Sequence, residues 1–273
     1  SIPSFLMHYG DAVVSNFPNY YAIASEGSFI TPSQFVDFCK EARIDFKEEY
    51  PSCELLDKEK LSASFKVREP IFSTRKLSEL VHERLEMAGV NVMTDSVVSS
   101  AEKNPGGGYS VVISGRRRTF DKVVNATYAG LNVINKIFNV RPRELRFEKT
   151  VVPVFRYPLA KIGLTVMDGP FCTIMPNGDS QEEFLLWHVD GCVISNATAL
   201  ENLRDIKAPD KEISERIFHM SREFMPFMKD VEFCSLMKTT KAVYENKYDA
   251  RVSEVHTYED DPDFVSVLSG KIM

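Results

Sequence analysis

Apolar and polar residues alternate over much of the chain, and longer helical patterns interrupt this alternation at a few places. Period-two alternation is typical of strands, and it marks residues 61–72, 109–120 and most of 145–195. Apolar residues spaced three and four apart predict helices that begin near Thr31, Ser73 and Asp210. Residues 1–29 are rich in aromatic residues and lack helical periodicity. The pattern predicts a mixed α and β protein.

Two of the predicted helices carry clear end signals. Thr31 as N-cap, Pro32 at the first helical position and Gln34 at the third form a capping box. Residues 73–89 form an amphipathic pattern that ends at a C-cap glycine, Gly89. Its apolar face consists of Leu77, Leu80, Val81 and Leu85. The helix over 210–230 is expected to be interrupted near Pro226.

Residues 61–140 are predicted to run strand, helix, strand, hairpin, strand and helix. The first three elements end with a strand over 90–95 and have the spacing of a βαβ unit, so part of this sheet should be parallel. Ser114-Gly115 is the predicted hairpin turn, with Arg116 to Arg118 on the exposed side. From 145 to 195, strand-like runs joined by short turns such as Asn177-Gly178 predict a largely antiparallel sheet.

The stretch "KVVNATYAGLN", residues 122–132, reads as a buried strand that turns sharply into a helix. Only small or polar side chains stand at the turn, over Asn125, Ala126 and Thr127. Small residues at such a turn allow another backbone or a ligand to come close. The turn is therefore a candidate binding element.

Composition narrows the function classes. The 273 residues are 44% apolar and 26% charged with a formal net charge of −6, which is ordinary globular composition for roughly two domains or one large one. The acidic balance argues against a nucleic-acid or anionic-membrane partner, since phosphate binding requires clustered cations. The five cysteines show no close pairing and indicate buried thiols in a reducing compartment. No transmembrane-length run or secretory signal pattern occurs, so a cytoplasmic protein is expected.

Several catalytic signatures are missing from the sequence. It contains no G-x-G-x-x-G, no P-loop, no H-x-x-x-H spacing and no G-x-S-x-G, so a metal site or a serine hydrolase is not indicated. His188 follows an apolar strand, and it is either a core histidine with a hydrogen-bond partner or a site residue. Alternation puts one of Tyr20 and Tyr21 inside and the other outside, where it either packs at the rim or lines a pocket.

An ordered set of motifs resembles a known family. "VREPIFSTRKLSELVHERLEMAGVNVMTDSVVSS", "FDKVVNATYAGLN" and "VSVLSGKIM" resemble FAD-dependent oxidoreductases of the D-amino-acid oxidase class, and a bacterial branch of it in particular. The motifs of that branch match, in order along nearly the whole chain, residues 20–23, 125–128, 164–171, 188–189 and 269–272. The resemblance implies an α+β fold. A large, mainly antiparallel substrate-domain sheet (1–60 and 141–257) would join an incomplete, Rossmann-like FAD-binding portion (61–140 and 258–273).

The resemblance also implies site residues. The cofactor FAD would lie with its pyrophosphate beside Asn125, Ala126, Thr127 and Tyr128, its adenine near Val97 and Val98, and its isoalloxazine near Gly270, Lys271 and Ile272. The substrate would lie near His188, Tyr21, Met175 and Arg251. In the catalytic roles, His188 would make a polar contact to substrate. Lys271 would favour the anionic reduced flavin.

The implied function is oxidation of a small amine, amino acid or hydroxy acid by hydride transfer to flavin. The missing G-x-G-x-x-G makes the sequence look like an internal segment of such an enzyme, and this chain alone is expected to be inactive. Two alternatives stay open: a non-catalytic binding or scaffold module without flavin, and one subunit of a split flavoenzyme. We expect a small-molecule substrate, no nucleic acid or membrane partner, and self-association through an exposed sheet edge.

Overall fold

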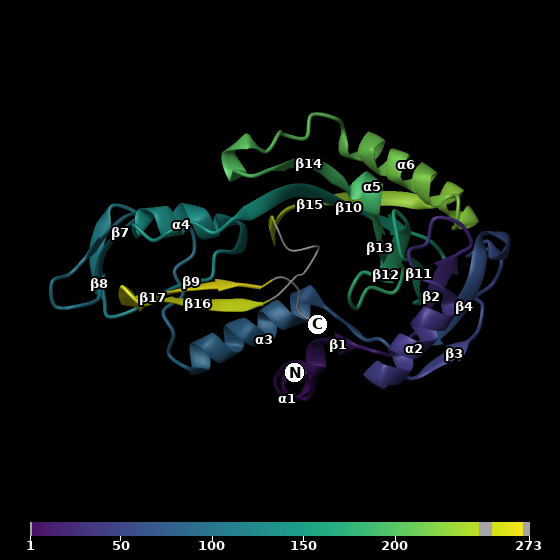
Figure 1. The fold of residues 1–273 in the computed structure, drawn as a ribbon, viewed down its shortest axis with the longest axis horizontal. Helices are drawn as coiled ribbons and strands as arrows, with labels where there is room; N and C mark the ends of the chain where they lie inside the picture. The colour runs from purple at the N-terminus through teal and green to yellow at the C-terminus, as the bar shows by residue number, and fades with distance from the viewer. Residues whose placement is uncertain (1, 246–252, 270–273) are drawn as a thin grey trace. The chain divides into compact units, whose positions relative to one another are not determined.

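The computed structural model describes residues 2–245 and 253–269 (Figure 1). The chain forms two compact units. Unit 1 contains residues 1–87, 150–194 and 206–238, and unit 2 contains residues 88–149, 195–205 and 239–273. Residues 61–87 thus pack in unit 1 and residues 239–257 are grouped with unit 2, so this division differs from the domain boundaries expected from the sequence.

Most of a nine-stranded sheet belongs to unit 1, while its residues 145–149, 195–197 and 239–244 are grouped with unit 2 (Figure 1). Its strand order is β14 (Val193–Ala197), β10 (Leu145–Arg156), β13 (Glu183–His188), β12 (Cys172–Pro176), β11 (Gly163–Met167), β2 (Asn19–Ala24), β4 (Leu61–Val67) and β3 (Phe46–Glu48), with β15 (Glu232–Tyr244) also paired to β10. The pairs β10/β13, β13/β12, β12/β11, β2/β4 and β4/β3 are antiparallel, whereas β11/β2 is parallel. The predicted mainly antiparallel sheet and α+β class are confirmed.

The two faces of this sheet are covered differently. One face packs against α6 (Asp210–Ser221) and η5 (Pro226–Lys229), and Phe155, Phe184 and Phe218 are almost completely buried there. The break in the predicted third helix falls before Pro226, as expected. On the other face, α2 (Pro32–Ala42) covers β2 and β4 through Phe35 and Cys39.

Local sequence signals set the ends of α2. The Thr31 side chain accepts a hydrogen bond from the Gln34 N–H (3.3 Å), and the Thr31 N–H donates to Gln34 Oε1 (2.8 Å). The capping box is therefore complete, with Pro32 at the first helical position where its missing N–H has no cost.

The remaining elements of unit 1 include α1 (Ile2–Tyr9), η1 (Gly10–Ala12), β1 (Val13–Val14) paired with β5 (Ile71–Phe72), η2 (Lys58–Lys60), α3 (Thr74–Met87) and α5 (Val189–Cys192). The helix α1 corrects the sequence analysis, which found no helical period in this stretch. It is stabilised by tertiary contacts, because Phe5 packs on Phe72 and the Arg84 guanidinium lies over the Tyr9 ring. The amphipathic helix α3 forms as predicted, but none of its residues is fully buried.

Unit 2 holds two three-stranded sheets. One is β6 (Val98–Lys103), β7 (Tyr109–Ile113) and β8 (Arg116–Phe120), and the other is ordered β16 (Glu254–Tyr258), β17 (Asp261–Leu268) and β9 (Val123–Asn125). The chain also forms η3 (Tyr128–Gly130), α4 (Leu131–Ile137) and η4 (Leu200–Asn202). Tyr109, Phe138 and Phe264 centre one core, and Leu131, Phe147 and Leu268 centre another. The hairpin at Ser114-Gly115 is confirmed.

Two predictions in unit 2 were wrong. Residues 90–95 form no strand, and Val90 and Val92 are about half exposed. No described strand lies beside them, and an extended segment without a partner leaves its backbone N–H and C=O groups without hydrogen bonds. The expected βαβ unit is therefore absent from the described residues. The strand before the 125–128 turn is only partly buried: among the described strands β9 pairs with β17 alone, at a sheet edge, and Val124 is 63% exposed although Asn125 is buried.

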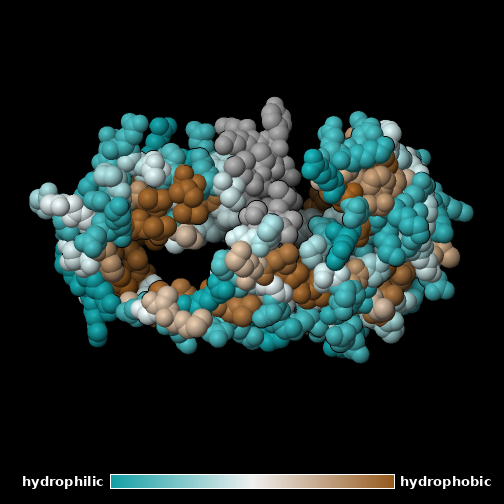
Figure 2. Space-filling model, turned by 90° about the horizontal axis from the view of Figure 1, so that it is seen from below, coloured by the Kyte–Doolittle hydropathy of each residue, from teal (hydrophilic) through white to brown (hydrophobic). Residues whose placement is uncertain are grey.

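Hydrophobic residues also reach the molecular surface in several places (Figure 2). The most exposed large apolar side chains include Met7, Phe29, Met87 and Val255. Within the described part of the chain, no helix combines the length and apolar character that a membrane crossing requires.

Candidate functional site

A row of side chains crosses four strands of the large sheet on the face opposite α6. Tyr21 of β2 pairs with Thr165 of β11, Thr165 pairs with Thr173 of β12, and Thr173 pairs with Trp187 of β13. Paired residues of neighbouring strands point to the same face. All four side chains are half-buried, and Trp187 also packs against the core of unit 1.

A second pair adds apolar surface beside this row. Met175 pairs with Leu185, and both are half-buried. Leu185 and Trp187 are two residues apart on β13, so they face the same way. We call Tyr21, Thr165, Thr173, Met175, Leu185 and Trp187 the half-buried row. It combines two hydroxyls, a phenol and apolar side chains on one face, which suits a small ligand with polar and apolar parts.

Tyr21 is held in place at one end of the row. Its hydroxyl donates to Glu69 Oε2 (2.5 Å), and its ring stacks on Phe35 with centroids 6.0 Å apart. Burial, and then the hydrogen bond to Glu69, raise the pKa of Tyr21 well above its usual value. The phenol therefore stays protonated at neutral pH.

His188 lies on the other face of the sheet. It follows Trp187 directly in β13 and pairs with buried Cys172, so its side chain points to the α6 side. It is 7% exposed, and its Nδ1 has no hydrogen-bond partner among the described residues. Burial lowers the pKa of His188, although Asp190 and Glu223 act in the opposite direction. The structure thus brings Tyr21 and Met175 to one face but does not bring His188 to them.

The turn after β9 is organised by one buried amide. Asn125 is 2% exposed, and its Nδ2 donates to the Leu131 carbonyl (3.0 Å) and to Asn135 Oδ1 (2.7 Å). Its Oδ1 accepts from the Thr127 hydroxyl (2.7 Å) and the Thr127 N–H (3.2 Å). These four bonds fix the path from strand to helix, because both ends of the turn attach to the same side chain.

The middle of this turn faces solvent. Ala126 and Thr127 are exposed, whereas Tyr128 has a left-handed backbone (φ 53°) and packs beside the Leu131 core. The turn thus exposes backbone next to small side chains, as the sequence suggested, and the Asn125 side chain itself points inward.

The other predicted residues are placed as follows. Val97 is 68% exposed, and its backbone N–H and C=O already bond to the Ser114 Oγ (3.1 Å) and N–H (2.8 Å). Val98 begins β6 and pairs with Ile113. The predicted residues Arg251, Gly270, Lys271 and Ile272 lie outside the described residues.

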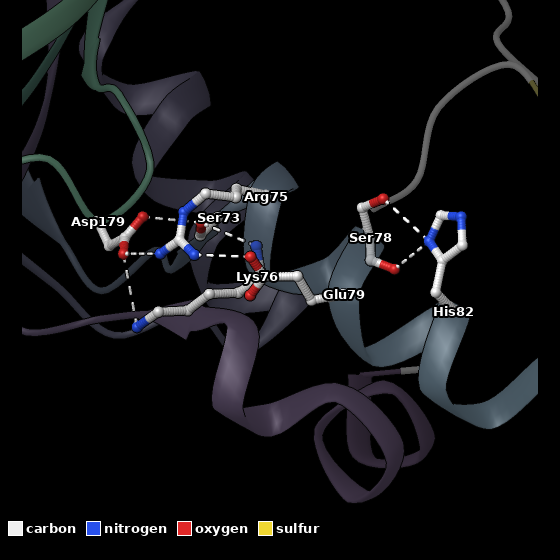
Figure 3. Close-up of polar contacts among 7 residues, drawn as sticks. All are labelled: Ser73, Arg75, Lys76, Ser78, Glu79, His82 and Asp179. Atoms are coloured by element: carbon white, nitrogen blue, oxygen red, sulfur yellow. Dashed lines mark hydrogen bonds and ion pairs between the residues drawn. The ribbon is translucent and has the colours of Figure 1, made fainter. Parts of the chain in front are cut away.

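A polar cluster at the start of α3 was not predicted (Figure 3). Asp179, in the β12–β13 turn, accepts from the buried Ser73 hydroxyl (2.9 Å) and from Arg75 Nη2 (2.8 Å). Lys76 Nζ lies 3.6 Å from the same carboxylate. The hydrogen bonds from Ser73 and then Arg75 lower the pKa of Asp179 to about 2. The carboxylate thus serves as the anion at this helix N-terminus and joins the turn to α3.

The half-buried row was also largely missed by the sequence analysis. It did not select Thr165, Thr173, Leu185 or Trp187, because each is an ordinary strand residue. The usable signal was period-two alternation in "FLLWH", which puts Leu185 and Trp187 on one face and His188 on the other.

Comparisons with known proteins give similarity at the level of structure. No family model matches the sequence, and no curated protein matches it. Glycine oxidase from Geobacillus kaustophilus superposes with a TM-score of 0.73 at 11% identity, over 98% of this chain and 70% of that one. NikD, an amino acid oxidase essential for nikkomycin biosynthesis, superposes with a TM-score of 0.74 at 11% identity, over 99% and 72%.

A third solved structure contains the cofactor. The L-α-glycerophosphate oxidase from Mycoplasma pneumoniae with FAD bound superposes with a TM-score of 0.70 at 12% identity, over 94% of this chain and 68% of that one. The chain therefore shares the fold of FAD-dependent amino acid oxidases, which confirms the fold that the resemblance to the D-amino-acid oxidase class implied.

Proposed function

We propose that this chain is part of an FAD-dependent oxidoreductase that oxidises a small amine, amino acid or hydroxy acid. The observation that carries the proposal is the fold shared with oxidases over nearly the whole chain. Fold alone does not fix activity, so the site must supply the rest. The half-buried row supports it, because it offers hydroxyl and apolar side chains to a small polar substrate.

In this proposal, the half-buried row binds and orients the substrate. The Thr165 and Thr173 hydroxyls can each donate and accept a hydrogen bond, and the Met175 and Leu185 side chains exclude water from the apolar part of the substrate. FAD, when bound, supplies the acceptor for the hydride that leaves the substrate carbon. Lys271 keeps its proposed role as flavin-stabilising cation, and Arg251 its proposed place near the substrate. His188 is not proposed as a contact to a substrate bound by the row, because it is buried on the opposite face of the sheet.

The fit of these residues to FAD is partial. The exposed backbone at Ala126 and Thr127 suits a close approach by the cofactor, which supports a place for the pyrophosphate beside this turn. Against this, the Val97 backbone is already bonded, and the sequence has no glycine-rich turn opening a helix to receive a pyrophosphate. We therefore propose that this chain contributes part of the cofactor site.

The test is an absorbance spectrum of the purified chain before and after incubation with FAD and desalting. Retained flavin bands, bleached anaerobically by a panel of amino acids and hydroxy acids, would support the proposal. Thr173→Val should then retain the flavin but slow bleaching, while Thr198→Val on an exposed loop should change neither. Flavin retained but left oxidised by every substrate would contradict the proposed activity, and a colourless chain would favour the alternatives.

One subunit of a split flavoenzyme is a second candidate, and the free edge of β9 favours it. Among the described strands, β9 pairs on one side with β17, and its other edge, beside exposed Val124, can accept a strand from another chain. If the tagged chain is purified from its source cells, a second protein that contains G-x-G-x-x-G and bound FAD should co-purify with it. Val124→Lys should release that partner, whereas Val133→Lys on α4, also exposed, should not. Recovery of the chain alone and colourless would leave the non-catalytic scaffold as the better interpretation.

A further inference from the structure

A groove of about 630 Å³ lies in unit 1 on the α6 side of the large sheet. One wall is α6, which contributes residues at steps of three and four and hence from one helical face. These residues are Lys211, Glu215, Phe218 and His219, and Arg222 follows directly at the C-cap of the helix. The other wall is η5 and the start of β15, which follow α6 in the chain (Figure 1). The groove is thus on the opposite face from the half-buried row.

The floor of the groove is apolar. Phe218 and Met228 are 4% and 1% exposed, and the half-buried side chains of Val231, just before β15, and of Phe233, in β15, also line the groove. A volume of this size is in the range of small-molecule sites, which are mostly apolar with a few polar groups. An aromatic and thioether floor adapts to a hydrocarbon or ring of varied shape.

The charged rim of the groove is unbalanced. Both carboxylates that line the groove are already paired with a cation. Glu215 Oε1 lies 3.7 Å from Lys211 Nζ, and Glu232 Oε2 lies 3.2 Å from Arg156 Nη1. Arg222 and Lys229 also line it, are exposed, and form no ion pair with any described residue. Two uncompensated cations beside an apolar floor therefore favour an anion with an apolar part.

We propose that this groove binds a small amphipathic carboxylate. The planar guanidinium of Arg222 matches a carboxylate through two parallel hydrogen bonds, and Lys229 adds a second positive charge. The hydrocarbon or aromatic part of the ligand lies against Phe218 and Met228. This site is separate from the proposed substrate row, so the ligand need not be a substrate of the proposed oxidoreductase.

Octanoate is the probe, titrated into the full chain with ¹³C-methyl methionine labelling. Its binding should shift the Met228 methyl resonance, assigned with Met228→Leu. Arg222→Gln with Lys229→Gln should weaken binding by about tenfold or more. The matched control is Arg216→Gln with Lys207→Gln, two exposed cations that do not line the groove, and it should leave affinity within about twofold.

The neutral analogue octanamide separates charge recognition from apolar contact alone. It should bind at least about tenfold more weakly than octanoate. Equal binding of the two probes would overturn the proposal, as would equal octanoate affinity in the double variant and its control. Absence of any Met228 shift at about 10 mM octanoate would also overturn it. Melting curves of both double variants verify that each is folded.

Discussion

Asn125→Ala removes the amide that organises the turn after β9. The side chain is 2% exposed and makes four hydrogen bonds, to Leu131, Asn135 and twice to Thr127. A hydrogen bond contributes about 1 kcal/mol net, and a buried group left unbonded costs about 1–3 kcal/mol. Asn135 Oδ1 keeps its bond from the Ser266 hydroxyl (3.0 Å), which limits the loss on that side. We therefore expect unit 2 to lose about 2–4 kcal/mol of stability.

Hydrogen exchange measured by mass spectrometry is the assay, because two units need not unfold in one transition. Peptides that cover 123–137 should exchange faster in Asn125→Ala, and peptides of unit 1 should not change. Thr127→Val removes the hydroxyl bond and should cost about 1 kcal/mol. Asn202→Ala, an exposed amide in unit 2, is the control and should have no effect. A loss below about 0.5 kcal/mol in Asn125→Ala would refute the reasoning.

Two further predictions concern unit 1. The pKa of Asp179 is lowered from 3.8 to about 2 in the folded chain. The ionised carboxylate therefore stabilises the fold fully above pH 3.8, and this stabilisation is lost as the pH falls towards 2. Asp179→Asn should therefore lower the urea midpoint at pH 6, and the difference from the unmodified chain should shrink below about pH 4; a gap independent of pH would contradict this. Gly163→Ala should cost about 1–3 kcal/mol, because the added methyl would overlap the buried Asn19 amide; an unchanged melting temperature would show that Asn19 can move.

The sequence was sufficient to predict the local structure where residues close together in the chain determine it. The capping box at Thr31 and Gln34 and the Ser114-Gly115 hairpin involve residues within three positions of each other, so their chemistry can be read directly. Residues 90–95 show the opposite case. Their alternation is that of a strand, but a strand also needs a partner, and pairing is a property of distant residues.

The candidate site was predictable only in part for the same reason. Alternation separates Trp187 from His188, but it does not tell which of the two faces α6, because that helix comes over twenty residues later. Register brings Thr165 beside Thr173 of the next strand and beside Tyr21, which comes from a strand far away in the sequence. The turn at Asn125 was identified from its small residues, yet its inward-pointing amide depends on Asn135 in the following helix.

The discontinuous make-up of the two units has a consequence for biosynthesis. The chain passes between them at 87/88, 149/150, 194/195, 205/206 and 238/239, so no single cut releases either one intact. The last segment of unit 1 ends at residue 238. At about 5–20 residues per second, a ribosome needs roughly 12–48 s to translate residues 1–238. During that time β2 lacks its parallel partner β11 and β10 lacks β15 until these later strands are made. The nascent chain should therefore depend on chaperones more than a protein with sequential domains does.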